Sequence, residues 1–144
     1  MANEAVIVNK YGYPPGEPME ATCAAGTAIS YGTWLVWADL DTVIASSGIN
    51  QSPAGIAAMD KDASDPSTKI SFFTNVDADC VSVAGTVNLP LAGYPVELSG
   101  ANLVRLSNRY GVSGAEFISG AAFQAGKSKE TASASERIMV RVRL

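Results

Sequence analysis

The amino-acid sequence predicts a small all-β protein, a β-barrel or β-sandwich with an extended N-terminal arm. Its 144 residues correspond to the length of one domain. Only 17% of them are charged, against about 25% in an average soluble domain, and 13 glycines help to make up the difference. Apolar side chains recur at every second position in several short segments, as in half-buried strands. Together these observations favour short strands and tight turns over helices.

Strands are expected where β-branched or aromatic residues cluster between turn residues. The C-terminus is the clearest case, because Ile138, Val140 and Val142 alternate with three arginines and a methionine. In chain order the predicted strands cover residues 5–8, 33–38, 42–45, 54–58, 69–74, 80–84, 95–98, 103–106 and 137–144. Residues 112–122 are the one segment that could form a short helix, although Gly114 and Gly120 argue against a long one.

The first 18 residues differ in composition from the rest, which divides the sequence into an N-terminal arm, 1–18, and a single β domain, 19–144. An apolar run, Ala5, Val6, Ile7 and Val8, precedes a stretch that holds three of the seven prolines. Because proline lacks a backbone donor and fixes φ, this stretch is expected to be an extended connector. The apolar run then either forms an edge strand on its own domain or reaches outward and adds a strand to a neighbouring chain.

A weak internal repeat is present in the sequence. Gly32 is followed eleven residues later by Val43, and Gly93 and Val104 have the same spacing. Ala-Gly-Thr precedes both glycines, and each half continues with small residues, at 54–58 and 119–123, before a closing strand. Two such halves would build one barrel or sandwich and shield strand edges by closure.

The residue types exclude several classes of function. Ten basic and fourteen acidic residues give a net charge of −4, so no nucleic-acid partner is expected, because such binding depends on a basic surface. The chain has no histidine, which removes Ser-His-Asp and Cys-His catalysis and every zinc site that contains histidine. Common phosphate-binding, dinucleotide-binding and nucleophile motifs are also missing from the sequence. We therefore expect no enzyme activity, no catalytic residues, no cofactor and no metal.

The lack of a visible secretory signal and the cysteine spacing predict a protein made in the cytoplasm. No secretory signal is visible at the N-terminus, and no segment has the uninterrupted apolar length of a membrane span. Cys23 and Cys80 fit no ligand spacing and are expected to be reduced, half-buried thiols. From Lys127 onward five basic residues outnumber two acidic ones, so this end is either a docking face or an ordinary strand with outward arginines.

The aspartates are weak candidates for binding or catalysis. Residues 60–65 resemble a calcium loop but lack its turn glycine and its bidentate glutamate. Two pairs, Asp39 with Asp41 and Asp77 with Asp79, lie at turn signals, where aspartate bonds to nearby backbone groups. We interpret these residues as turn and connector residues.

Two tryptophans, Trp34 and Trp37, are three residues apart and therefore face opposite sides of a strand. One is expected in the core and the other exposed or at an interface, since a large exposed indole is costly unless covered.

Four segments in this order resemble the capsid cement, or head decoration, proteins of tailed bacteriophages. They are residues 20–36 (EATCAAGTAISYGTWLV), 53–62 (PAGIAAMDKD), 98–104 (LSGANLV) and 130–144 (ETASASERIMVRVRL). The resemblance runs from about residue 17 to the end. It departs from the family's pattern at Ser135, where a turn glycine is expected, and between residues 108 and 123.

The resemblance implies a tulip-like β-barrel and a role without catalysis. Such proteins form homotrimers on the outer surface of an icosahedral head, at threefold and quasi-threefold points where subunits of the major capsid protein meet. On this hypothesis the chain is a structural protein of the virion that stabilises the mature capsid. Its contacts with the capsid or a neighbouring subunit would come from residues 5–8, with Tyr11 and Tyr13 as aromatic anchors.

Two other classes of function remain open. The chain could be a carbohydrate- or host-surface-binding module displayed on a virion, with Trp34 or Trp37 as a stacking platform. A small hydrolase built on the aspartates is the third interpretation.

Overall fold

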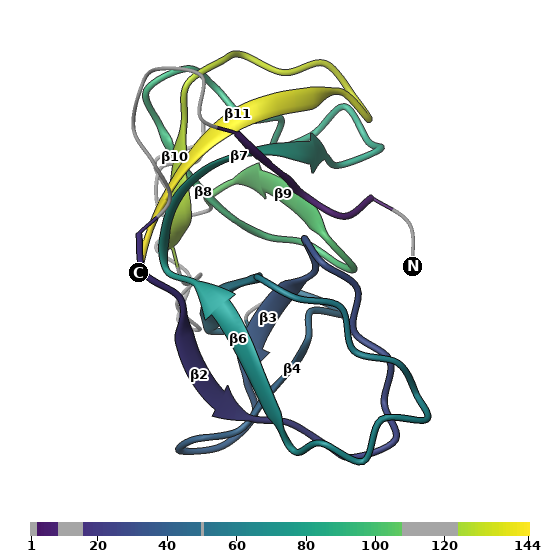
Figure 1. Cartoon of the computed structure of the whole chain (residues 1–144). Coiled ribbons are helices and arrows are strands. Elements are labelled where there is room, and N and C mark those ends of the chain that lie inside the picture. Colours follow the sequence, from purple (N-terminus) through teal and green to yellow (C-terminus); the bar gives the residue numbers. More distant parts are fainter. Residues whose placement is uncertain (1–2, 9–15, 50, 108–123) are drawn as a thin grey trace.

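The strands of this protein form two units, one above the other, in the computed structural model (Figure 1), which describes residues 3–8, 16–49, 51–107 and 124–144. The N-terminal sheet consists of β2 (Met19–Thr22), β3 (Trp34–Trp37), β4 (Val43–Ala45), β5 (Pro53–Ala57) and β6 (Lys69–Phe73). The other unit contains β1 (Val6–Val8), β7 (Asn75–Ser82), β8 (Pro95–Leu98), β9 (Leu103–Leu106), β10 (Gln124–Ser128) and β11 (Arg137–Arg143). The protein is therefore all-β, as predicted.

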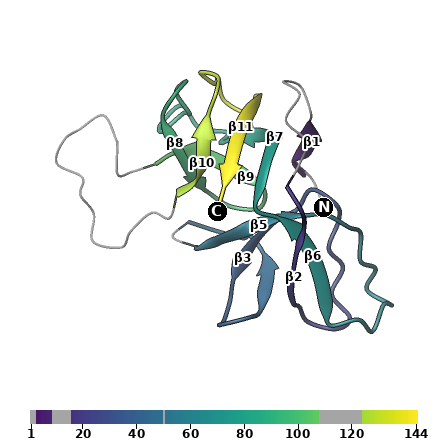
Figure 2. The same ribbon diagram turned by 60° about the vertical axis from the view of Figure 1, so that its left-hand side comes forward.

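Strands β7 to β11 close into a barrel, named here the C-terminal barrel. Their order is β7-β11-β10-β8-β9, and β9 pairs back onto β7 in parallel through Val81–Leu103 and Ser82–Val104. Strand β1 lies outside this ring and, among the described strands, pairs with β7 alone (Figure 2). Closure satisfies the backbone groups of β9 that an open sheet would leave at its edge.

The N-terminal sheet has the same strand order as the C-terminal barrel. Taken in chain order, β2 to β6 correspond one by one to β7 to β11. With this correspondence, its order β2-β6-β5-β3-β4 is the same as β7-β11-β10-β8-β9 in the barrel. A parallel bridge links Thr22 of β2 to Thr42, just before β4, where the barrel has the parallel pairing of β7 with β9. The weak repeat in the sequence therefore corresponds to a repeated topology.

Backbone hydrogen bonds repeat between the two units as well. In the first, the Ser46 N–H donates to the Trp34 carbonyl at 2.8 Å, and in the second the Ser107 N–H donates to the Pro95 carbonyl at 3.0 Å. Both units also need a glycine in the corresponding strand. A Cβ at Gly55 in β5 would collide with the carbonyl of Phe73, and a Cβ at Gly126 in β10 would collide with that of Arg141.

The two units share apolar packing. One buried cluster lies in the N-terminal sheet and includes Leu35, Ile70 and Phe72. The other lies in the C-terminal barrel, but it also takes in Trp34 and Ile56 from β3 and β5 of the sheet. Because side chains of one unit complete the core of the other, the two units form one structural body.

Most predicted strands are confirmed to within two residues at each end. Residues 80–84 are a clear exception, since the strand in this region, β7, begins five residues earlier at Asn75. Strand β2 was not predicted at all. The helix considered at 112–122 and the small-residue segment at 119–123 lie outside the described residues, and β10 begins at Gln124.

Candidate functional site

The predicted contact residues at the N-terminus lie against the body of the molecule. Strand β1 runs antiparallel to β7, with Val6 opposite Asp79, Ile7 opposite Ala78 and Val8 opposite Asp77. Ala5, just before this strand, is buried in the core of the C-terminal barrel, and its N–H donates to the carbonyl of Gly32 at 2.8 Å. Residues 5–8 were expected either to form an edge strand on their own domain or to reach out to a neighbouring chain. In the single chain, residues 6–8 form the edge strand.

The six predicted contact residues therefore differ in their surroundings. Ala5 is buried, Ile7 and Val8 are half-buried, and Val6 has 48% of its surface exposed. Tyr11 and Tyr13 lie outside the described residues. Only β7 pairs with β1 among the strands of the described ranges, so the second edge of β1 has no strand partner there. Among the described contact residues, Val6 is therefore the one that is exposed.

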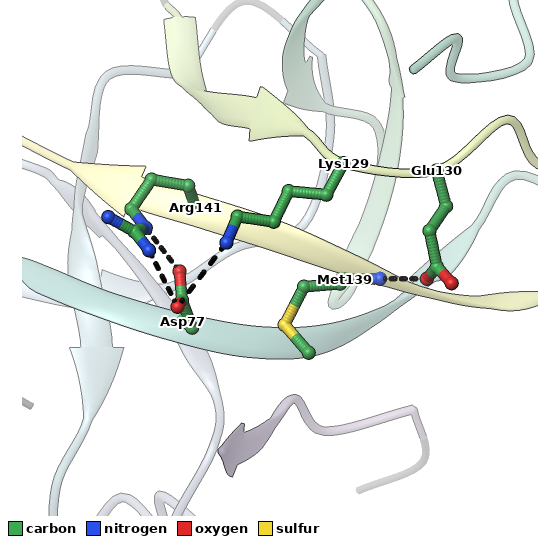
Figure 3. A network of polar contacts seen from close by, with 5 residues as sticks. All are labelled: Asp77, Lys129, Glu130, Met139 and Arg141. Atoms are coloured by element: carbon green, nitrogen blue, oxygen red, sulfur yellow. Dashed lines mark hydrogen bonds and ion pairs between the residues drawn. The ribbon is translucent and has the colours of Figure 1, made fainter. Parts of the chain in front are cut away.

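An ion cluster lies beside β1 on the same sheet (Figure 3). The Asp77 side chain on β7 is 1% exposed, and both of its oxygens accept hydrogen bonds from the Arg141 guanidinium on β11, the bond from Nη2 being 2.8 Å long. The Lys129 ammonium lies 3.6 Å from the same carboxylate. The prediction that Asp77 and Asp79 occupy a turn is wrong, because both lie within β7. One arginine of the basic C-terminal strand is thus paired inside the molecule.

An apolar groove of about 360 Å³ opens beside Trp37. Its lining residues are Met19, Trp37, Ser52, Pro53, Ala54, Thr74, Gln124 and Leu144. The Trp37 ring meets Phe72 of the sheet's core edge-on, with centroids 5.9 Å apart, and remains 38% exposed. Trp34 is completely buried, which confirms that the two indoles face different environments and removes Trp34 as a stacking platform.

The other aspartates take part in local structure. In the segment 60–65, Lys61 is buried. Its ammonium donates to the carbonyls of Thr27 at 3.1 Å and of Asp65 at 3.3 Å. The Asp60 carboxylate accepts the Tyr31 N–H. The Asp39 carboxylate accepts the Leu40 N–H at the β3–β4 turn, as predicted for a turn residue.

Cys23 and Cys80 are both free and buried. Burial raises the pKa of the Cys80 thiol to about 12, so this side chain is protonated and unreactive at neutral pH. Within the described ranges, no three His, Cys, Asp or Glu side chains are grouped so that they could hold a metal ion. The same part of the chain contains no helix long and apolar enough to cross a membrane.

No protein-family model matches the chain, and no curated protein is similar to it at a significant level.

Proposed function

We propose that this chain is a capsid decoration protein that binds the outer surface of an icosahedral phage head and stabilises the mature shell. The observation that carries the proposal is the position of β1, an apolar strand at the end of a sheet, whose second edge pairs with no other strand within the described residues. A strand of the shell can add to such an edge through backbone hydrogen bonds. The resemblance of residues 17–144 to decoration proteins supports the choice of a phage head as the partner.

The physical mechanism is linkage between binding and shell stability. A protein that binds only the mature surface stabilises that state by mass action. Each added backbone hydrogen bond contributes about 1 kcal/mol, and covering the exposed part of Val6 contributes about as much again. Three subunits bound together at a threefold point multiply these modest contacts through effective concentration. The partners in this proposal are the major capsid protein and two further copies of the chain, and its location is the outside of the virion after synthesis in the host cytoplasm.

The experiment uses purified heads that lack the protein and a variant of the exposed edge. Val6→Lys places a charge on β1 where the wild-type side chain is 48% exposed, so the fold is retained while strand addition is hindered. Val87→Lys, at a loop position with 73% exposure, is the matched control. We expect wild-type and V87K to bind at the copy number of threefold sites and to raise the temperature at which heads rupture, and V6K to bind at least tenfold more weakly. Absence of wild-type binding to any head would contradict the function, and equal binding by V6K would contradict the role of β1.

The second candidate function, a carbohydrate-binding module, is favoured by Trp37 alone. Its indole is partly exposed beside polar Gln124, Ser52 and Thr74 in the groove, and an indole face can stack on a sugar. This function predicts that tryptophan fluorescence shifts on addition of a glycan and that Trp37→Ala abolishes the shift. The decoration function predicts no such response.

A further inference from the structure

We infer that the apolar groove beside Trp37 is the subunit interface of a closed threefold ring, and that it receives the β3–β4 turn of a neighbouring copy. This turn carries Leu40, whose side chain is 95% exposed. The inference rests on the trimer of the proposed function, but it requires no capsid.

The β3–β4 turn presents Leu40 on an ordered hairpin. The Ala38 N–H donates to the Thr42 carbonyl at 2.9 Å, and the Leu40 N–H donates to the Asp39 carboxylate at 2.7 Å. A leucine held in this way loses little conformational freedom on binding, so most of its burial energy is available to an interface. Ile44, on the following strand, adds a second exposed apolar side chain.

The equivalent turn of the C-terminal barrel is already a docking element within the chain. The Asn102 side chain in the β8–β9 turn accepts the Trp34 N–H at 2.8 Å, and the Asn102 N–H donates to the Ser46 hydroxyl at 3.1 Å. A backbone bridge between Gly48 and Gly100 extends this contact. One of the two equivalent turns is therefore covered by the other unit, whereas the β3–β4 turn exposes its apolar tip.

The turn cannot repeat that intramolecular contact on a second copy. The position equivalent to Trp34 in the C-terminal barrel is Pro95, which has no N–H to donate. The corresponding face also holds the buried Glu97, paired with Arg105 at 2.5 Å. If a second copy receives Leu40, it does so through a surface other than this face.

The groove matches this turn in polarity and charge. Met19, Pro53, Ala54 and Leu144 give it an apolar lining. Arg143 lies on an adjoining hollow that shares Thr74 and Leu144 with the groove, and its side chain is exposed. Leu40 is flanked by two exposed aspartates, Asp39 and Asp41. Insertion of the leucine would bring these carboxylates to a rim that carries a guanidinium.

The contact joins two different surfaces of the same chain. A contact of this kind generates either an open filament or a closed ring. A reciprocal pair or any closed ring uses every turn and every groove once, and we take three copies because the proposed function requires a trimer.

Sedimentation of the free full-length chain tests the interface. We expect a wild-type trimer whose association weakens by roughly tenfold or more in Leu40→Asp and is unchanged in Val87→Asp, a matched control on another exposed loop. Arg143→Glu should weaken association, and adding Asp41→Arg to it should restore part of the loss. A wild-type chain that stays monomeric, or a trimer insensitive to L40D, would overturn the inference.

Covalent trapping tests the geometry. The native cysteines are buried, so Leu40→Cys and Met19→Cys introduce the accessible thiols. Mild oxidation of the double variant should link chains in a ladder that ends at three, while either single variant should form far less linked product. A ladder that ends at two would overturn the threefold ring.

The two proposals fail in different ways. If L40D is monomeric but wild-type trimers do not bind heads, the interface stands and the decoration function fails. If heads bind L40D and wild-type equally and the free chain is insensitive to L40D, the decoration function stands and the interface fails.

Discussion

Asp77 occupies a position within β7 where aspartate is usually disfavoured. Its carboxylate is buried, and the positive charges of Arg141 and Lys129 compensate it. Arg141 keeps 19% of its side-chain surface and Lys129 keeps 30%, so water reaches the cationic half of the cluster. The cluster is therefore costly to break but contributes less than a fully buried pair.

Replacing Asp77 by asparagine should destabilise the protein. The variant leaves Arg141 beside a neutral amide that cannot accept from the guanidinium on both sides, and we expect a loss of about 2–3 kcal/mol in the free energy of unfolding. Urea denaturation measures this change. Asp62→Asn, at an exposed position, is the control and should shift the free energy by less than about 0.5 kcal/mol. Equal effects of the two variants would contradict the role of the cluster.

Cys80 contributes a stability that is lost at alkaline pH. The pKa of its thiol rises from 9.0 to about 12 because of burial, so the folded state holds the proton more tightly than the unfolded state. This contribution is fully present below pH 9 and is lost as the pH rises through 12. We expect the unfolding free energy of the wild type to fall between pH 9 and 11 by a few kcal/mol more than that of Cys80→Ala. Parallel curves for the two proteins would contradict this expectation.

At the scale of elements, β1 joins the two units. It pairs with β7 of the C-terminal barrel, while the Ala5 N–H just before it bonds to Gly32, which precedes β3 of the N-terminal sheet. Gly32 has a φ of +88°, and a Cβ there would collide with the Ala5 carbonyl. This close approach explains why glycine stands at the position and shows that the N-terminal run is part of the fold.

Removal of residues 2–8 should therefore lower stability. Loss of the β1–β7 pairing and of the buried Ala5 is expected to reduce the unfolding free energy by about 2–4 kcal/mol. Chemical denaturation measures the effect, with Val6→Ala as a control that keeps the backbone pairing and changes stability by less than about 1 kcal/mol. An unchanged midpoint in the shortened chain would argue that β1 does not contribute to the body.

The strands that were hardest to predict are those with weak local signals. Strand β2 has the sequence Met-Glu-Ala-Thr, which contains no aromatic residue and only one β-branched residue, and its conformation is set by pairing with β6. The first half of β7 contains Asn75 and Asp77, residues typical of turns. It is held in the sheet by β11, which starts about sixty residues further along the chain.

For the whole molecule, the shared apolar packing predicts a single unfolding transition. Trp34 belongs to the N-terminal sheet by sequence but packs in the cluster of the C-terminal barrel, whereas Trp37 contacts the sheet's own core through Phe72. Fluorescence of Trp37→Phe reports from Trp34, and fluorescence of Trp34→Phe reports from Trp37. Within each variant, the fluorescence transition and the loss of far-ultraviolet circular dichroism should coincide. A fluorescence change well separated from the circular dichroism change would mean that the two units unfold independently.

The sequence alone determined the all-β class, most strands, the opposite placement of the two tryptophans and the repeat, whereas it predicted half-buried cysteines that the structure shows to be buried. These features depend on periodicity and on turn residues, which are local properties of a chain. Only the tertiary structure decided that β1 folds back on its own β7, that Asp77 meets Arg141, and that Met19, Trp37 and Leu144 share one groove. Each of these depends on contacts between residues far apart in the chain, because burial and charge compensation are decided by the neighbours that folding brings together.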